Sequence, residues 1–270
     1  MSDEPPLVPM PKGLQWVRVA VRGLALALLI FGGLVLMLAL RLVERPVFGV
    51  RRPWTPHITV FVCRSAFRFL GIRYVAHGKR MTRPGAIVAN HSSWMDIFAL
   101  NAGARVYFVS KSEVARWPGI GWLAKATGTV FITRDRREAT AQKDVFEERL
   151  GAGHKLLFFP EGTSTDGQRV LPFKPTLFAA FFSESLRDFL WVQPVTVVYR
   201  APEDTEPRFY GWWGDMDFGS HLLAVLAQSP QGTVEVFWHA PVKVSEFTDR
   251  KALARVAEAT VKEAHLSASG

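Results

Sequence analysis

The 270-residue chain contains a single cysteine, Cys63. One thiol can form neither an internal disulfide nor a cysteine-based metal site. Cys63 lies in the apolar stretch 58–70, where a buried thiol behaves as a small, inert hydrophobe. The cysteine content therefore excludes a disulfide framework, and we expect no nucleophilic role for Cys63.

Motifs of several other protein classes are also missing. The sequence has no zinc-finger spacing and no long Lys/Arg block, which argues against a nucleic-acid partner. No second histidine stands at ligand spacing from His91, so we expect no metal site and no bound cofactor. A nucleophile elbow would read G-x-S-x-G, and the nearest stretch, 162–167, has the wrong spacing. Internal repeats and low-complexity tracts are absent as well.

Acidic residues are fewer than basic residues in this chain. The chain has 33 Lys and Arg residues against 24 Asp and Glu residues, a formal net charge of +9. Such an excess serves ordinary solubility or attracts anionic surfaces, and without nucleic-acid motifs it favours acidic lipid headgroups. Hydrophobic residues make up 49% of the sequence, enough for a substantial folded core.

A long apolar run occupies positions 23–40 near the N-terminus. Its 18 residues would extend roughly 27 Å as a helix, close to the thickness of the hydrocarbon core of a bilayer. A secretory signal peptide is the first alternative, but the run is long for one and no small-x-small cleavage site follows. A buried core helix is the second, although apolarity on every side is unusual in a soluble domain. The run predicts a membrane helix.

The flanking charges predict the orientation of this helix. More arginines follow the run than precede it, which places the C-terminal bulk on the cytoplasmic side of the inner membrane. The next segment, 55–70, mixes apolar residues with Arg64 and Arg68 and predicts an amphipathic interfacial helix. We expect residues 1–70 to form a membrane anchor and residues 71–270 a catalytic domain. Whether the anchor spans the bilayer or enters one leaflet is left open.

From Ile72 onward, short runs rich in Val, Ile and Phe alternate with helical stretches. This alternation predicts an α/β fold, a mostly parallel sheet flanked by helices and preceded by the helical membrane anchor. The expected strands are 73–77, 86–89, 105–109, 129–132, 155–159, 191–199 and 233–239. The expected helices are 94–103, 137–150, 176–187 and 250–265.

The stretch AIVANHSSWMDIFAL carries the first candidate chemistry. An apolar strand ends at Asn90, His91 follows, and Ser92 or Ser93 can cap a helix that begins near Trp94. Asp96 then falls in the first turns of that helix, from where its carboxylate can reach one ring nitrogen of His91. That contact would fix the tautomer and leave the other nitrogen free to accept a proton from an alcohol. The alternative is a structural histidine beside a helix-terminal charge.

Polar groups follow three further strands. Lys111 follows YFVS, Thr133 and Arg134 follow the strand that ends at Ile132, and a Glu-Gly-Thr turn follows LLFFP. Carboxyl ends of parallel strands share one edge of a sheet, so we expect these groups near His91. Arg134 and Lys111 could hold a phosphate or carboxylate, and Gly162 would allow backbone N–H groups to approach a ligand.

The motifs NHSSWMD, GTVFITR, FFPEGTS and VQPVTVV stand in the order and spacing of glycerolipid acyltransferases of the 1-acyl-glycerol-3-phosphate acyltransferase type. The resemblance covers roughly residues 72–200. It implies that His91 is the general base and that Asp96 orients it. It also implies that Arg134, Glu161, Gly162 and Thr163 bind the polar head of the acceptor. The implied acyl donor is a thioester of acyl carrier protein or coenzyme A, with direct attack and no acyl-enzyme.

Two departures from the family pattern bear on the acceptor. Ser164 stands where the family commonly has Arg, and Thr133 where it often has Asp or Arg. Lys174 could replace the missing cation, although a solvated lysine is the simpler interpretation. The passage 209–217 resembles a branch that includes lyso-ornithine lipid acyltransferases.

The expected activity is acyl transfer from a thioester to the hydroxyl of a lysolipid, with 1-acyl-glycerol-3-phosphate as the main acceptor. A lyso-ornithine lipid is the alternative acceptor. A lipid esterase and a non-catalytic lipid-binding membrane protein are the competing hypotheses, and the second leaves the His91–Asp96 pair without a purpose.

Overall fold

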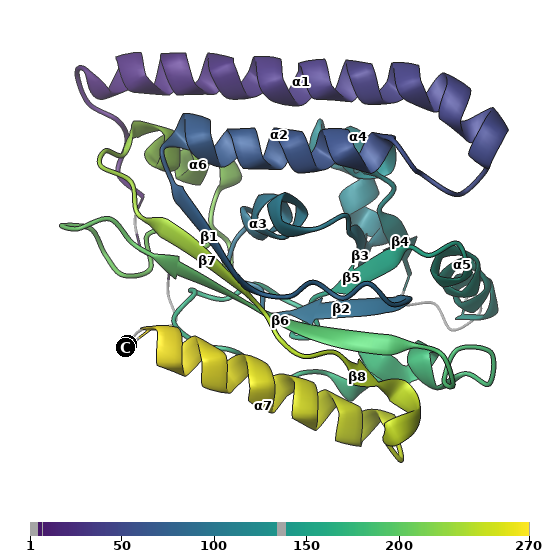
Figure 1. Cartoon of the computed structure of the whole chain (residues 1–270). Helices are drawn as coiled ribbons and strands as arrows, with labels where there is room; N and C mark the ends of the chain where they lie inside the picture. The colour runs from purple at the N-terminus through teal and green to yellow at the C-terminus, as the bar shows by residue number, and fades with distance from the viewer. Residues whose placement is uncertain (1–4, 7, 134–138, 270) are drawn as a thin grey trace.

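Two long helices precede alternating strands and helices in the computed structural model, which describes residues 5–6, 8–133 and 139–269 (Figure 1). The α-helices are α1 (Gln15–Phe48), α2 (Thr55–Leu70), α3 (Asp96–Gly103), α4 (Ile120–Thr127), α5 (Ala139–Gly151), α6 (Phe218–Ala227) and α7 (Arg250–Ser269). The strands are β1 (Arg73–Gly78), β2 (Gly85–Ala89), β3 (Tyr107–Lys111), β4 (Val130–Ile132), β5 (Lys155–Phe158), β6 (Trp191–Arg200), β7 (Thr233–Trp238) and β8 (Val242–Lys243). Short 3₁₀ helices are η1 (Ser112–Arg116), η3 (Pro175–Phe182) and η4 (Val244–Glu246).

The strands join in one sheet with the order β1-β7-β6-β2-β5-β3-β4, and β8 pairs with β6. Strands β6, β2, β5, β3 and β4 are parallel neighbours, whereas β7 runs antiparallel to β6 and parallel to β1. The carboxyl ends of the five parallel strands therefore share one edge of the sheet. The predicted α/β fold with a mostly parallel sheet is confirmed, and all seven predicted strands are present.

Strand β2 is central because all five of its residues, GAIVA, are buried. Its side chains alternate between two hydrophobic cores, as the period of a strand requires. Ile87 and Ala89 belong to the core beneath α2 and α3, whereas Ala86 and Val88 belong to the core on the α7 side. A strand covered on both faces reads as a continuous apolar run, which is why the sequence predicted it.

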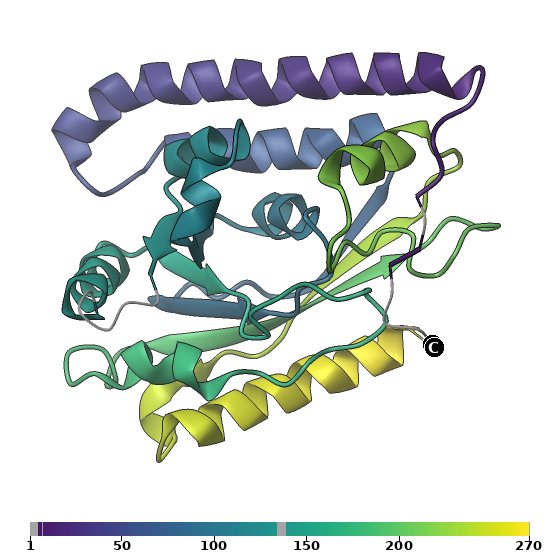
Figure 2. The same ribbon diagram turned by 180° about the vertical axis from the view of Figure 1, so that it is seen from behind.

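The helices form layers on the two faces of the sheet. Figures 1 and 2 show α7 on one face, α3 on the other, α2, α4 and α6 above α3, and α1 as the outermost layer. Helix α1 is attached near both ends. Arg18 and Arg22 donate to carbonyls at the C-terminal end of α6, including Ala227 O at 2.6 Å. Near its other end, the buried Glu44 carboxylate accepts hydrogen bonds from the start of α2.

The outer face of α1 is apolar and uncovered. Leu28, Val35 and Leu42 expose 67%, 68% and 79% of their surface. The helix has a mean hydropathy of 2.7 over its most apolar 18 residues, of which 11% are buried. A long apolar N-terminal helix of this kind suggests membrane anchoring.

Several element predictions need correction. The apolar run 23–40 is only the middle of a 34-residue helix, because the charged ends of α1 are held by α6 and α2. The helix predicted for 176–187 is a 3₁₀ helix that ends at Phe182. Side chains three apart lie above one another in a 3₁₀ helix, and this brings Phe178 and Phe181 onto the buried side together. Helices α4 and α6 were not predicted.

Candidate active site

His91 and Asp96 are in contact at the carboxyl edge of the sheet. Strand β2 ends at Ala89, so His91 stands just beyond that edge, and Asp96 is the first residue of α3. The distance from His91 Nδ1 to Asp96 Oδ2 is 2.7 Å. Asp96 is fully buried, whereas the side chain of His91 keeps 21% of its surface exposed. The contact expected from the five-residue spacing is therefore present, with the imidazole open on one side.

Three further donors surround the Asp96 carboxylate. The backbone N–H groups of Ser92 and Ser93 donate to Oδ2 at 2.8 and 3.0 Å, and the Tyr199 hydroxyl donates to Oδ1 at 2.8 Å. Burial, together with the Asp96 charge, holds the pKa of Tyr199 well above its ordinary value, so this hydroxyl keeps its proton. A buried carboxylate with these partners favours an N–H at Nδ1 of His91. Nε2 then carries a lone pair, and no described residue donates a hydrogen bond to it.

The turn between His91 and α3 is organised by Asp96 rather than by a serine cap. The N-cap residue of α3 is Met95, and no side chain caps it. Ser93 Oγ only accepts a bond from Met95 N at 3.3 Å. The predicted capping role is thus wrong for this helix, because the Asp96 side chain folds back onto the N–H groups of the turn and delays the helix by two residues.

Glu161 holds the backbone of His91 in place. Its Oε1 accepts from His91 N at 2.6 Å and its Oε2 from Leu171 N at 2.7 Å. The residue is 1% exposed, and this burial raises the pKa of the carboxyl to about 7, although the two N–H groups act in the opposite direction. These contacts are those of a positioning residue, since both carboxylate oxygens already face backbone donors.

An aromatic side chain forms one wall beside His91. The Phe159 ring stacks on the imidazole with centroids 4.0 Å apart and an interplanar angle of 12°. Phe108 of β3 stacks in turn on Phe159 at 5.8 Å. The stack fixes the plane of the imidazole from one face, while Asp96 fixes it from the edge.

The other predicted site residues do not all lie beside His91. Gly162 has a φ of +74°, and a Cβ there would stand 2.6 Å from Lys174 Nζ, so the lysine lies against the Glu-Gly-Thr turn. Thr163 and Lys174 are both exposed. Lys111, also exposed, ends β3, which is two strands away from β2 in the sheet. Arg134 lies outside the described residues.

Comparison with known proteins finds related acyltransferases. A family model described as acyltransferase matches residues 67–198. The chain is 57% identical to the lyso-ornithine lipid O-acyltransferase of Rhodobacter capsulatus, over 97% of this chain and 95% of that protein. It is 41% identical to the 1-acyl-sn-glycerol-3-phosphate acyltransferase of Neisseria gonorrhoeae, but over only 34% of this chain and 36% of that protein.

The chain belongs to the lysophospholipid acyltransferase family. A solved structure shares the fold: the 1-acyl-sn-glycerophosphate (LPA) acyltransferase of Thermotoga maritima superposes with a TM-score of 0.66 at 21% identity. The match covers 95% of this chain and 96% of that one. Family membership makes the chain an O-acyltransferase, with a lysolipid acceptor and an acyl donor.

Two residues of this candidate site were missed by sequence reasoning. Tyr199 belongs to a predicted strand, and Phe159 to another, but apolar-strand patterns do not distinguish a core ring from one that faces a site. A signal did exist for Tyr199, since a tyrosine in a fully buried strand must find a partner for its hydroxyl.

Proposed function

We propose that the protein transfers a fatty acyl chain from a thioester to the hydroxyl of a lyso-ornithine lipid. The observation that carries this proposal is the near full-length similarity, at 57% identity, to the Rhodobacter capsulatus lyso-ornithine lipid O-acyltransferase. Similarity to a 1-acyl-sn-glycerol-3-phosphate acyltransferase extends over about a third of the chain. The alternative acceptor of the sequence analysis is thus better supported than 1-acyl-glycerol-3-phosphate.

In this proposal His91 is the general base. Nε2 takes the proton of the acceptor hydroxyl while the hydroxyl oxygen attacks the thioester carbonyl carbon. The C–S bond then breaks, and the leaving thiolate takes the proton back from the imidazolium. Asp96 stabilises the imidazolium, and Tyr199, Phe159 and Glu161 keep the imidazole and its backbone in place.

The negative oxygen of the tetrahedral intermediate needs donors, and removal of one such donor typically costs about 2.7–4 kcal/mol. In the turn that follows His91, the backbone N–H groups of Ser92 and Ser93 are already engaged, because both donate to Asp96. Gly162 N also donates to Phe159 O at 3.0 Å. Among the described residues this leaves the backbone N–H groups of Trp94 and Thr163, which we assign to this role.

We assign the polar head of the acceptor to the turn at Gly162 and Thr163, with Lys174 as its cation and with Arg134 and Lys111 as further binding residues. A headgroup that offers a carboxylate matches a single nearby lysine. The donor is a thioester of acyl carrier protein or coenzyme A.

We also propose that residues 1–70 anchor a catalytic domain, 71–270, on the cytoplasmic face of the inner membrane. As a helix, the 34 residues of α1 extend about 50 Å, well beyond the roughly 30 Å of a hydrocarbon core. The bonds to α6 and α2 hold α1 along the body of the molecule (Figure 2). A helix so attached fits immersion in one leaflet better than a perpendicular crossing.

A direct test offers purified protein both a lyso-ornithine lipid and 1-acyl-glycerol-3-phosphate with one labelled acyl thioester. We expect acyl transfer to the lyso-ornithine lipid to dominate in kcat/KM. Preferential acylation of 1-acyl-glycerol-3-phosphate would refute the proposed acceptor and leave the chemistry intact.

The catalytic assignment is tested by His91→Ala. The variant should remain in the membrane fraction, because α1 is unchanged in it, and should lose acyl transfer by roughly 10²-fold or more. The same assay on Ser92→Ala, Ser93→Ala and Ser164→Ala should retain activity, since direct transfer needs no serine nucleophile. Wild-type turnover by the His91 variant contradicts the mechanism.

A further inference from the structure

A large groove lies at the edge of the sheet opposite the one that carries His91. It has a volume of about 780 Å³. One wall is the α1–α2 connection with the first half of α2. The other contains the starts of parallel strands, at Tyr107 of β3 and Lys155 of β5, with the end of β7 at Trp238. Neither His91, Asp96 nor Glu161 lines it. The groove is therefore a second site, separate from the proposed catalytic centre.

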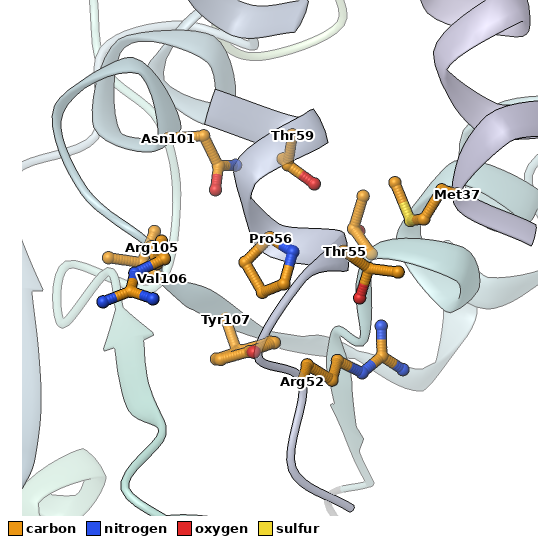
Figure 3. Close-up of a pocket in the computed structure, with 10 residues that line it drawn as sticks. Met37, Arg52, Thr55, Pro56, Thr59, Asn101, Arg105, Val106 and Tyr107 are labelled. Carbon is orange, nitrogen blue, oxygen red and sulfur yellow. The ribbon is translucent and has the colours of Figure 1, made fainter. Parts of the chain in front are cut away.

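The groove is lined by cations and, within the described residues, by no carboxylate. Its Arg and Lys residues are Arg51, Arg52, Arg64, Arg80, Arg105 and Lys155, and two imidazoles, His57 and His154, also line it. A smaller cavity of about 10 Å³ adjoins it and shares Arg52, Pro56, Arg105 and Tyr107 (Figure 3). In Figure 3, Arg52 and Arg105 lie on opposite sides of Tyr107. Positive charge thus stands on both walls of the hollow.

Neutral groups hold several of these cations in position. Arg52 donates to Ala126 O at 2.7 Å and Arg64 to Ala102 O at 2.8 Å. Arg105 donates to His57 Nε2 at 3.3 Å. Since carbonyls and an imidazole do not neutralise a guanidinium, these hydrogen bonds hold the cations in place without compensating their charge. The side chains of three more, Arg51, Arg80 and Lys155, make no hydrogen bond or ion pair with any described residue.

Two buried donors in the groove lining also lack an acceptor. His154 Nδ1 accepts from Arg149 Nε at 2.6 Å, so the ring proton is at Nε2, and this atom has no partner among the described residues. Trp238 Nε1 has none either. Buried donors without acceptors cost free energy, and so do cations held near one another. Burial and the neighbouring Arg149 and Arg52 lower the pKa of His154 to about 3.

The surface beside the groove is apolar and belongs to the membrane anchor. Phe48 lines the groove, and its neighbours Val47 and Trp54 expose 64% and 44% of their surface. The exposed Leu42 lies further along the same end of α1. An occupant must therefore combine acceptor-rich negative charge with an apolar portion. We propose that the groove binds the phosphate headgroup of an anionic phospholipid of the membrane in which α1 is immersed.

Such a lipid is neither acceptor nor donor in the proposed reaction, because it binds at the other edge of the sheet. Together with α1, it would fix the height and tilt of the catalytic domain relative to the bilayer. Each cation near an anionic membrane surface strengthens binding of the protein to the membrane. The groove gathers several such cations at one site.

The test measures quenching of tryptophan fluorescence in the full-length protein, reconstituted in phosphatidylcholine vesicles that contain brominated lipid. Trp54 and Trp238 report from beside the groove and from its wall. Brominated phosphatidylglycerol should quench more strongly than brominated phosphatidylcholine at the same mole fraction. The variant Arg51→Gln/Arg80→Gln/Lys155→Gln should lose this preference by about tenfold. Arg51→Lys/Arg80→Lys keeps the charge and should keep the preference.

A matched control removes three charges from the opposite face of the molecule. The variant Arg250→Gln/Lys251→Gln/Arg255→Gln on α7 has the same net charge as the groove variant. Its tryptophan fluorescence should be quenched as in the wild type. If both variants lost the preference for phosphatidylglycerol equally, bulk electrostatics alone would explain it and the proposal would be overturned. A groove variant that keeps the wild-type preference would overturn it as well. Displacement of brominated phosphatidylglycerol by free coenzyme A would assign the groove to a soluble nucleotide instead and would also overturn it.

Discussion

Asp96 receives one of its hydrogen bonds from Tyr199, a residue 103 positions later in the chain. Because the carboxylate is fully buried, it has lost its hydrogen bonds with water, and donors from the protein must replace them. The Tyr199 hydroxyl is the contact farthest from His91 along the sequence, and it does not touch the imidazole. Its removal therefore tests positioning without touching the reacting atoms.

Tyr199→Phe should lower kcat by about tenfold and leave KM for the lysolipid nearly unchanged. The lost bond is one to a charged group, and such bonds are worth roughly 1.5–3 kcal/mol. Steady-state kinetics with varied lysolipid separates the two constants. Tyr210→Phe is the matched control, since the hydroxyl of Tyr210 bonds Gln231 and Gly232 instead. Equal kinetic losses in the two variants would mean that Tyr199 acts only through stability.

The buried Glu161 makes stability depend on pH. Burial raises its pKa to about 7 from an ordinary 4.5. Between these values the folded chain keeps a proton that the unfolded chain has released, so the contribution of Glu161 to the free energy of unfolding falls as pH rises. Glu161→Gln removes this titration. The stability of the wild type relative to the variant should drop by about 1–3 kcal/mol from pH 5 to pH 8.

Thermal unfolding in detergent at several pH values measures this difference. Glu203→Gln changes an exposed loop carboxylate and should track the wild type at every pH. If the wild type and the Glu161 variant differ by the same amount from pH 5 to pH 8, Glu161 does not titrate in this range.

At the scale of elements, Glu44 joins two helices. Its Oε1 accepts from the backbone N–H groups of Trp54 and Thr55, and its Oε2 from the Thr55 hydroxyl and from Arg41. A carboxylate at a helix N-terminus satisfies orphan N–H groups and complements the helix dipole. The end of α1 thus caps α2, and this fixes the connection 49–54 that forms part of the cationic groove.

Glu44→Ala should loosen this connection. The three donors at the start of α2 would lose their acceptor, at a cost of about 1–3 kcal/mol. We expect trypsin to cleave after Arg51 about tenfold faster than in the wild type, as measured by mass spectrometry. Arg45 and Arg52 both precede proline and are poor trypsin sites. Glu263→Ala on the exposed face of α7 should not change the cleavage rate. Unchanged proteolysis in the Glu44 variant would mean that other contacts hold the connection.

On the scale of the whole molecule, α1 presents an uncovered apolar face while its other face packs on the body. Removal of that exposed apolarity should release the protein from membranes. Leu28→Glu/Val35→Glu places two charges on the outer face, each costing roughly 2.5–3.5 kcal/mol in a hydrocarbon core. Membrane-bound protein after sedimentation should fall by at least about a hundredfold.

The same charge added elsewhere should have no such effect. Val256→Glu/Leu266→Glu on α7 replaces exposed apolar residues on the opposite face of the sheet. This variant should sediment with membranes as the wild type does. Release of both variants would indicate general misfolding, and retention of the α1 variant would contradict the proposed anchor.

The local features of the protein were readable in its amino-acid sequence. Strand β2 reads as a run of apolar residues because both of its faces are covered, and His91 and Asp96 are five positions apart across one turn, so their contact needs little more than local geometry. The order of the four motifs also carried the family resemblance.

Tertiary structure alone decided the rest. Tyr199 reaches Asp96, Glu161 holds the backbone of His91, and Glu44 caps α2, and each of these contacts joins different segments of the chain. Sequence patterns report the period of one element and not its neighbours, so they could not show that both carboxylate oxygens of Glu161 accept from backbone N–H groups. The cationic groove has the same origin, because its residues come from segments that only the folded sheet and helices bring together.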